Sequence, residues 1–321
     1  DGNENPFGPS PLALQALQNG YEAERYTDAN QTLLRKAIQN FLDVPSEAIV
    51  AGAGSDELID LIYRMWVQPG DRIVTCSPTF GMYAFDAAIY QAEFIDVNRK
   101  VDWSIDEEAL LREAENAKLV ILATPNNPTG NSLQPALIEK LLKTKALIVL
   151  DEAYIEFSES DSMANIACSH SSLIVLRTFS KWAGLAGLRI GYAVAHKRII
   201  EAFMKTKQPY NVSAPSVAAA IASLEDIEEL DRRASILTAE RDRVFSVLEK
   251  ISWLKPFQSE TNFLLVRTID RDANQISDNL RRKGIFIRTY SEGNIRDCIR
   301  ISMGTPLQND RVIEALSNLE R

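Results

Sequence analysis

The sequence predicts an α/β fold, with a mainly parallel, doubly wound sheet in a large domain and a small α+β domain towards the C-terminus. Three observations support this prediction. Short β-type runs alternate with helical patterns between about residue 27 and residue 225. Most of these runs are apolar throughout, which is typical of strands buried on both faces of a parallel sheet. From about Pro209 the pattern changes to two longer helices and then to a short mixed stretch.

Length and composition are those of a globular protein with a substantial core. The chain has 321 residues, of which 45% are hydrophobic and 25% are charged, and this length suggests two domains. The longest apolar runs, such as Ala146 to Leu150, are far shorter than the roughly 18 residues that cross a bilayer. The formal net charge of -9 lacks the basic surplus that favours nucleic acid. We therefore expect no membrane and no nucleic-acid partner.

Residues 1–26 are expected to form an N-terminal arm, extended over its first part. Residues 1–11 have neither a cationic start nor an apolar run, so we expect no signal peptide or anchor there, and a cytoplasmic protein. The large domain would follow over residues 27–225. It begins with a helix over Asn30 to Leu42, whose apolar residues recur at helical spacing and which stops near Pro45.

The remaining elements of the large domain alternate between strand and helix. The β-type runs that we expect to build the sheet are Ile49–Ala51, Arg72–Cys76, Glu93–Val97, Leu119–Ala123, Ala146–Leu150, Ser172–Leu176 and Gly191–Ala195. The helical patterns between them include Asp56–Trp66, Asp106–Ala114 and Leu137–Lys143. An Ala-rich helix over Pro215 to Leu224 completes this part of the chain.

A long, charged amphipathic helix over Ile227 to Lys250 begins the small domain, residues 226–321. Its charge pattern predicts a solvated helix with one packed face. A coiled-coil partner is the alternative, although the helix offers few heptads for one.

Cysteine and histidine content argues against a metal site, a disulfide framework and a serine hydrolase. Cys76, Cys168 and Cys298 are widely spaced and odd in number, which fits a reducing compartment. His170 and His196 are the two histidines, they lie in polar surroundings, and no CxxC or HExxH spacing occurs. The chain also lacks a G-x-S-x-G motif. We therefore predict no bound metal.

The residues that follow the strands carry the candidate chemistry, because ligands of open α/β sheets bind at the carboxyl ends of the strands. The run Gly52-Ala53-Gly54-Ser55-Asp56-Glu57 leads from a strand into a helix, so its N–H groups and the helix dipole could bind phosphate. The alternative is an ordinary helix cap, because glycine with Ser or Asp also begins helices that bind nothing.

Asp151 follows the apolar run Ala146 to Leu150, which places a carboxylate at the tip of a buried strand. An ionised group there is costly unless a cation or a donor meets it. The partner would be either the protonated ring nitrogen of a cofactor or a structural arginine, and the sequence leaves both open.

Lys181 follows the next buried strand and precedes a turn with Gly184 and Gly187. Burial lowers the pKa of a lysine towards the neutral amine that forms Schiff bases with carbonyl compounds. The alternative is an ordinary surface lysine. Arg189, at the end of the same turn, offers a planar cation suited to phosphate.

Several of these motifs occur together in one known family. Ser180-Lys181 with Gly184 to Arg189, Pro125-Asn126-Asn127-Pro128-Thr129-Gly130 and Asp151-Glu152-Ala153-Tyr154 resemble the fold-type I aminotransferases, which use pyridoxal 5'-phosphate (PLP). Further segments resemble the histidinol-phosphate aminotransferase family: Asn3–Pro9, Arg25-Tyr26, Gly54–Glu57, Pro78–Tyr83, Ser259–Phe263 and Ile299-Arg300-Ile301. The resemblance runs through the whole chain in the same order, and it implies an aspartate aminotransferase-like fold.

The resemblance also implies roles for single residues. Lys181 would hold PLP covalently and move the proton at the amine-bearing carbon of the substrate, with Asp151 and Tyr154 completing the catalytic set. The cofactor-binding residues would be Gly54, Ser55, Asp56, Phe80, Asn127, Asp151, Tyr154, Thr178, Ser180, Lys181, Arg189 and Tyr26. Of these, Tyr26 would reach in from the second subunit of a homodimer. The substrate-binding residues would be Asn5, Tyr26, Asn127, Arg288 and Arg300.

The implied activity is the PLP-dependent transamination of histidinol phosphate with 2-oxoglutarate, which gives imidazole acetol phosphate and glutamate in histidine biosynthesis. Phe80, Thr27 and Trp182 depart from residues that are frequent in this family. An aromatic amino-acid aminotransferase and a threonine-phosphate decarboxylase share most of these motifs and remain alternatives. A non-catalytic PLP-sensing domain of a regulator is a third alternative. A nicotinamide dehydrogenase is disfavoured, because Glu57 stands where its third glycine would be.

Overall fold

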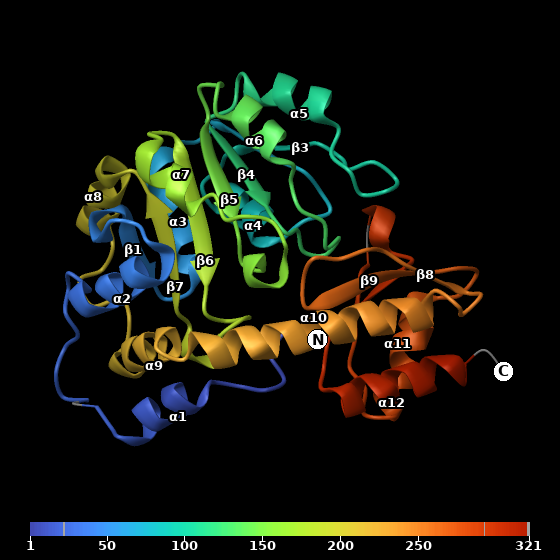
Figure 1. Cartoon of the computed structure of the whole chain (residues 1–321). Coiled ribbons are helices and arrows are strands. Elements are labelled where there is room, and N and C mark those ends of the chain that lie inside the picture. The colour runs from blue at the N-terminus through green and yellow to red at the C-terminus, as the bar shows by residue number, and fades with distance from the viewer. Residues whose placement is uncertain (22, 292, 320–321) are drawn as a thin grey trace.

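The computed structural model describes residues 1–21, 23–291 and 293–319, and within these ranges it contains two sheets (Figure 1). The larger has seven strands in the order β1-β7-β6-β5-β4-β2-β3. Their bounds are β1 Ile49–Gly52, β2 Arg72–Thr75, β3 Glu93–Asp96, β4 Leu119–Ala123, β5 Leu147–Asp151, β6 Leu173–Thr178 and β7 Gly191–Ala195. The pairings are parallel except those of β7, which lies antiparallel to β6 and β1. The predicted α/β class with a mainly parallel sheet is confirmed.

Helices cover both faces of this sheet because successive strand residues enter opposite cores. On β4, Leu119 and Ile121 join one apolar cluster, whereas Val120 and Leu122 join the other. The first cluster packs against α3 (Ser55–Trp66), α4 (Met82–Ile89) and α8 (Lys197–Thr206). The second packs against α2 (Thr32–Leu42), α5 (Glu107–Ala114), α6 (Pro135–Leu141) and α7 (Ala164–Ser169). The sheet is therefore doubly wound.

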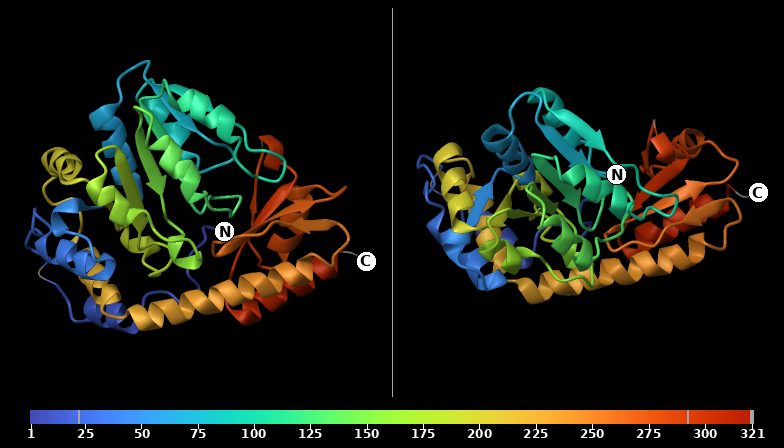
Figure 2. Two further views of the ribbon diagram at one scale, coloured as in Figure 1. Left: turned by 45° about the horizontal axis from the view of Figure 1, so that its top comes forward. Right: turned by 90° about the horizontal axis from the view of Figure 1, so that it is seen from above.

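The second sheet has four antiparallel strands in the order β10-β11-β9-β8. Their bounds are β8 Leu254–Pro256, β9 Phe263–Thr268, β10 Arg288–Thr289 and β11 Cys298–Ser302. The helices α11 (Ala273–Arg282) and α12 (Pro306–Ser317) accompany it. Figure 2 shows this sheet beside the larger one, with the N-terminus between them.

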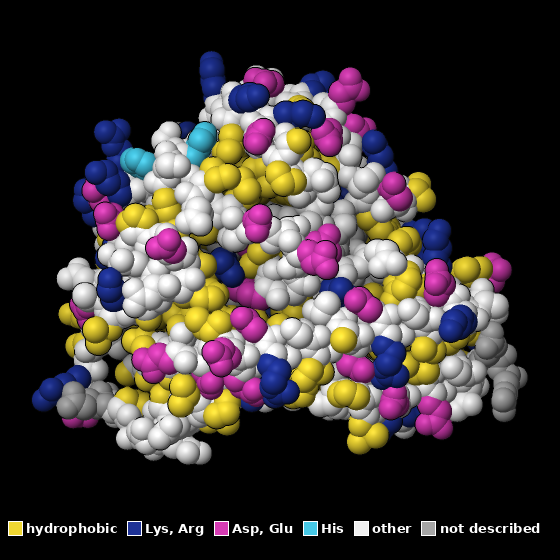
Figure 3. Space-filling model, viewed as in Figure 1, with side chains coloured by type: hydrophobic (Ala, Val, Ile, Leu, Met, Phe, Trp, Pro, Cys, Tyr) yellow, Lys and Arg dark blue, Asp and Glu magenta, His cyan; other side chains and the backbone are white. Residues whose placement is uncertain are grey.

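Helix α10, Ile227–Leu248, runs along both parts of the molecule (Figure 1). Its buried positions, such as Leu230, Leu237 and Val244, belong to an apolar cluster that also contains Leu150 of β5 and Phe263 of β9. Its outer face carries charges of both signs (Figure 3). The predicted solvated helix with one packed face is therefore present, and it ends two residues earlier than predicted.

Beyond its first ten residues, the N-terminal arm contains a helix that the sequence analysis did not predict, α1 (Pro11–Gln18). The Oγ of Ser10 accepts a hydrogen bond from the N–H of Ala13, and Pro11 occupies the first helical turn, where its missing N–H has no cost. α1 packs against α9 (Ala214–Leu224). In the described part of the chain, no helix is long and apolar enough to cross a membrane.

We predict that Leu237→Ala destabilises the whole chain, because Leu237 is fully buried in the cluster that spans both sheets. Removing such a side chain costs about 2–5 kcal/mol in the free energy of unfolding. Urea denaturation measures this loss. The control is Ser235→Ala, an exposed position on the same helix, which should change the free energy of unfolding by about 0.5 kcal/mol or less. Equal losses from both variants would contradict the assigned packing.

Candidate active site

A cavity of about 630 Å³ lies where the carboxyl ends of β4, β5 and β6 face the smaller sheet. Most of the predicted site residues line it: Ser55, Asp56, Phe80, Asn127, Asp151, Tyr154, Thr178, Ser180, Lys181, Arg189, Arg288 and Arg300. They come from segments that are far apart in the sequence. The topology brings them together because parallel strands place their carboxyl ends at one edge of a sheet.

Asp151, the last residue of β5, is 5% exposed. Its Oδ2 accepts a hydrogen bond from the hydroxyl of Tyr83 at 2.8 Å, and its Oδ1 accepts one from the N–H of Ala153 at 3.1 Å. Burial raises the pKa of the carboxyl group to about 6. Within the described ranges no arginine or lysine forms an ion pair with Asp151, so the structural arginine that the sequence left open is not there.

Lys181 lies across the cavity from the smaller sheet, three residues beyond the end of β6. Its Nζ donates a hydrogen bond to the backbone oxygen of Gly2 at 2.7 Å and lies 5.9 Å from the ring centre of Tyr154. Burial, followed by the positive charge of Arg300, lowers the pKa of the amine to about 8. A substantial fraction of Lys181 is therefore neutral near physiological pH, as the sequence predicted for a desolvated lysine.

Tyr154 and Asn127 present polar groups beside Lys181. The Tyr154 hydroxyl accepts a hydrogen bond from Nδ2 of Asn3 at 2.9 Å, and burial raises its pKa to about 12. The phenol is therefore neutral and can donate its proton to a ligand. Oδ1 of Asn127 accepts a hydrogen bond from Arg300 at 2.5 Å, which orients the amide so that its nitrogen can serve as a donor.

The predicted phosphate-binding segment surrounds the start of α3. Gly54 precedes this helix at φ +83°, and a side chain there would meet the guanidinium of Arg189 at 2.6 Å. The Arg189 guanidinium bonds Asp56 at 2.5 Å and approaches Oγ of Ser180 at 3.5 Å. Ser180 is itself bonded by the Thr178 hydroxyl at 2.9 Å. Hydroxyls, a helix N-terminus and a guanidinium thus converge, as an anion site requires.

Arg288 and Arg300 face each other across neighbouring strands, because β10 and β11 pair them directly. Like charges opposite each other destabilise a sheet unless an anion lies near them. Arg300 bonds the backbone oxygen of Asp1 at 2.6 Å, and its buried Nε has no partner in the described structure. Arg288 approaches the carboxylate of Asp1 at 3.7 Å. The pair therefore places two guanidinium groups at the end of the cavity formed by the smaller sheet, where they can bind an anion.

Three predicted site residues lie outside the cavity wall. Gly54 lies next to Arg189, because a Cβ added at Gly54 would overlap the Arg189 guanidinium. Asn5 uses its amide within the protein, because Nδ2 donates to the Trp182 backbone oxygen and Oδ1 accepts from the N–H of Phe7. Tyr26 is 82% exposed and stacks on Tyr210, with ring centres 4.4 Å apart. The structure thus brings neither Asn5 nor Tyr26 to the site of its own chain.

Sequence reasoning missed Tyr83, Asn3 and Gly2. Tyr83 ends the motif Pro78–Tyr83 and lies in the first turn of α4, so its membership of that motif could have marked it as a candidate. Gly2 and Asn3 contact the site through long-range bonds to Lys181 and Tyr154. Such contacts leave no periodic signal in a sequence.

Comparison with known proteins gives consistent results. The family model for aminotransferase class I and II matches residues 1–316. Histidinol-phosphate aminotransferase of Roseiflexus castenholzii is 44% identical over 99% of this chain and 88% of its own length. The chloroplastic enzyme of that name from Nicotiana plumbaginifolia is 41% identical over 99% of this chain and 78% of its own.

Solved structures agree with these relatives. Histidinol-phosphate aminotransferase from Sinorhizobium meliloti, solved in complex with pyridoxal-5'-phosphate, superposes with a TM-score of 0.92 at 32% identity, over 100% of this chain and 89% of that one. L-threonine-O-3-phosphate decarboxylase from Porphyromonas gingivalis has a TM-score of 0.86 at 23% identity, over 100% of this chain and 99% of that one, and shares the fold.

The lowered pKa of Lys181 predicts an early titration. In protein freed of small molecules, acetylation of Lys181 should show a pH midpoint near 8, whereas ordinary lysines titrate near about 10.4. Only the neutral amine reacts, so labelling rises with pH. Competitive acetylation followed by mass spectrometry measures the midpoint. Arg300→Gln should raise it, because the Arg300 charge opposes protonation of Lys181. A midpoint near 10 would contradict the assigned burial.

Proposed function

The chain belongs to the class I and II aminotransferase family, and from this premise we propose that it transfers the amino group of histidinol phosphate to 2-oxoglutarate. The products are imidazole acetol phosphate and glutamate, in histidine biosynthesis. The paired arginines Arg288 and Arg300, which face Lys181 across the cavity, are the observation that carries the proposal. Relatives named histidinol-phosphate aminotransferase, at up to 44% identity, support it.

The residues of the cavity fit PLP as the cofactor. Asp151 is a buried carboxylate without an ion-pair partner in the described part of the chain, which suits a protonated ring nitrogen. Lys181 is a partly neutral amine, and the segment at the start of α3 suits a phosphate group. When bound, PLP supplies an electron-accepting ring and a carbonyl carbon that stores the amino group between two half-reactions.

Lys181 acts as nucleophile and as base. Its neutral Nζ would hold the carbonyl carbon of PLP, and as a free amine it would accept the proton of the amine-bearing carbon of the substrate. The residues around Nζ set the position and the pKa of the amine. The Gly2 oxygen 2.7 Å away fixes its position, while burial and Arg300 keep its pKa near 8.

The walls of the cavity hold the ring. Asp151, oriented by the Tyr83 hydroxyl, would keep a proton on the ring nitrogen of PLP. Asn127, Tyr154 and Phe80 also line the cavity. The first two would donate hydrogen bonds to the ring oxygen, and Phe80 would stack on the ring face. Gly54, Ser55, Thr178, Ser180 and Arg189 form the phosphate site, in which Asp56 orients the guanidinium of Arg189.

Arg300 and Arg288 bind the anionic group of the substrate, with Asn127 and the partner subunit's Tyr26 as further substrate-binding residues. Asn5, which the family resemblance also implied, bonds Trp182 and Phe7 instead. The enzyme must accept a phosphate in one half-reaction and a carboxylate in the other. A guanidinium presents planar donors that match the oxygens of both groups. The unpartnered Nε of Arg300 supplies one such donor.

We further propose a homodimer with shared sites. Tyr26 and Leu33 are 82% and 74% exposed, and Tyr26 does not line the cavity of its own chain. In a dimer, Tyr26 would reach the phosphate site of the partner subunit.

The proposed domains are residues 27–225, which hold β1 to β7, and residues 226–321, which hold β8 to β11, with residues 1–26 as the arm. The free cysteines fit a cytoplasmic location.

Substrate preference tests the proposal. We expect kcat/KM to be highest for histidinol phosphate, lower for histidinol, which lacks the anion, and lowest for phenylalanine. Threonine phosphate should release no carbon dioxide. A preference for phenylalanine would replace the proposal by an aromatic aminotransferase, and carbon dioxide release would replace it by a decarboxylase. Binding of PLP without any turnover would indicate a sensing domain.

Loss of Arg300 probes the same assignment. Arg300→Ala should lower kcat/KM for histidinol phosphate by roughly ten- to a hundredfold, because it removes a charge-assisted contact. It should impair the half-reaction with 2-oxoglutarate as well. Arg296→Ala, at an exposed position in the turn before β11, is the matched control and should leave both half-reactions unchanged. An Arg300→Ala variant with normal kinetics would refute the assigned anion site.

Shared sites predict complementation between variants. Tyr26→Phe should weaken PLP retention, and Lys181→Ala should abolish turnover. Mixed dimers of the two would contain one site with both native residues and one with both changes, so turnover and PLP retention should recover in about half of the hybrid sites. Sedimentation measures the oligomeric state in parallel. A monomer at assay concentration, or mixtures without recovery, would contradict the dimer.

A further inference from the structure

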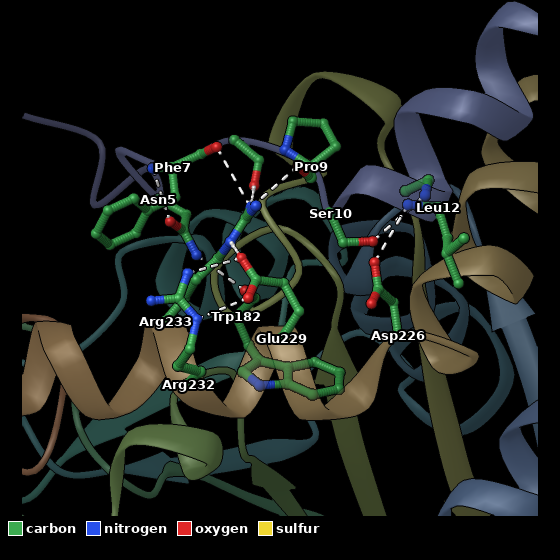
Figure 4. Close-up of polar contacts among 12 residues, drawn as sticks. Asn5, Phe7, Pro9, Ser10, Leu12, Trp182, Asp226, Glu229, Arg232 and Arg233 are labelled. Atoms are coloured by element: carbon green, nitrogen blue, oxygen red, sulfur yellow. Dashed lines mark hydrogen bonds and ion pairs between the residues drawn. The ribbon is translucent and has the colours of Figure 1, made fainter.

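Arg233 on α10 holds the N-terminal arm (Figure 4). Its NH1 donates to three consecutive backbone oxygens, those of Phe7, Gly8 and Pro9, at 3.4, 3.1 and 3.0 Å. Its Nε donates to Glu229 at 2.7 Å, one helical turn earlier, and its side chain is 11% exposed. The arm therefore crosses α10 where the largely buried guanidinium of Arg233 donates hydrogen bonds to three of its backbone oxygens.

The held segment also packs on the turn that carries Lys181. Nδ2 of Asn5 donates to the backbone oxygen of Trp182 at 2.9 Å, and the Trp182 indole N–H donates to Asp231 of α10 at 3.3 Å. Gly184 has φ +69°, and a Cβ there would overlap the Gly8 oxygen. Residues 5–9 thus lie between α10 and the Lys181 turn, in contact with both.

The first residues of the arm enter the active site from this anchor. Lys181 donates to Gly2, and the Asn3 side chain donates to the hydroxyl of Tyr154. Asn3 is held in turn by Ser302 of β11, at 2.7 Å from its Oδ1, and by Asn262, at 3.0 Å from its backbone oxygen. Displacement of the arm would hydrate Lys181 and remove a partner of Tyr154.

We propose that Arg233 is a positioning residue for the reaction, which keeps the arm on α10 so that Gly2 and Asn3 lie against Lys181 and Tyr154. This inference rests on the proposed function of the site. A planar guanidinium suits the task, because its NH1 faces the backbone oxygens while Nε pairs with Glu229. Arg233 touches no reacting atom and acts through the arm.

The neighbouring Arg232 provides a matched control. It bonds the same carboxylate, Glu229, at 2.7 and 2.9 Å, but its side chain is 60% exposed. None of the hydrogen bonds between α10 and the arm in the described structure involves it. Arg233→Met and Arg232→Met therefore remove the same charge from the same helix, and differ in the contact with the arm.

Three measurements test the inference. Hydrogen exchange of the peptide covering residues 3–10, in the PLP-loaded enzyme, should accelerate at least tenfold in Arg233→Met. The acetylation midpoint of Lys181, in cofactor-free protein, should move upward from about 8, because hydration relieves the burial that lowers this pKa. kcat/KM should fall at least tenfold. Arg232→Met should change none of the three.

Gly184→Ala is a second route to the same result, because it pushes Gly8 from the Lys181 turn while Arg233 stays in place. It should also accelerate arm exchange and raise the Lys181 midpoint, and it keeps the test decisive if Arg233→Met does not fold. Equal responses from Arg232→Met and Arg233→Met, or a faster arm with an unchanged Lys181 midpoint, would overturn the inference. Exchange and acetylation need no substrate, so they separate this inference from the proposed activity.

Discussion

The site depends on one costly arrangement, a carboxylate buried at the end of a central strand that forms no ion pair with any described arginine or lysine. Asp151 receives hydrogen bonds from Tyr83 and Ala153, and burial still raises its pKa to about 6. A cationic ligand would stabilise the buried carboxylate and offset its loss of hydration. The neighbouring strand β6 leads to Lys181, whose pKa burial lowers. Both pKa values are shifted from their usual range. A protonated ring nitrogen would stabilise the buried carboxylate of Asp151, and a carbonyl carbon would react with the neutral amine of Lys181.

The rest of the structure positions these two groups. The large sheet supplies the edge, the smaller sheet supplies Arg288 and Arg300, and α10 packs into a core shared by both. The arm closes the arrangement, because it reaches from Arg233 past the Lys181 turn to Tyr154 and Arg300. Catalytic geometry in this chain therefore rests on contacts made by the backbone of the arm as much as on the strand ends.

Much of this could be predicted from the sequence. The strands were recognisable because runs such as Leu119–Ala123 are apolar throughout, and most site residues follow such runs or lie in recognisable motifs. The long-range contacts could not be predicted. No local pattern shows that Tyr83 bonds Asp151, that Arg233 binds three carbonyl groups of the arm, or that strand register places Arg288 opposite Arg300. Asn5 and Tyr26 fit the motifs, yet the packing of a single chain keeps both off the cavity wall.

If PLP binds at the edge of the large sheet that carries Asp151 and Lys181, borohydride will fix it to Lys181. The experiment is to reduce the PLP-loaded protein with borohydride and to locate the cofactor by mass spectrometry of a digest. We expect the reduced cofactor on the peptide that contains Lys181, and we expect the absorption band of the bound cofactor to disappear on reduction. Attachment to a different lysine, or no attachment at all, would contradict it.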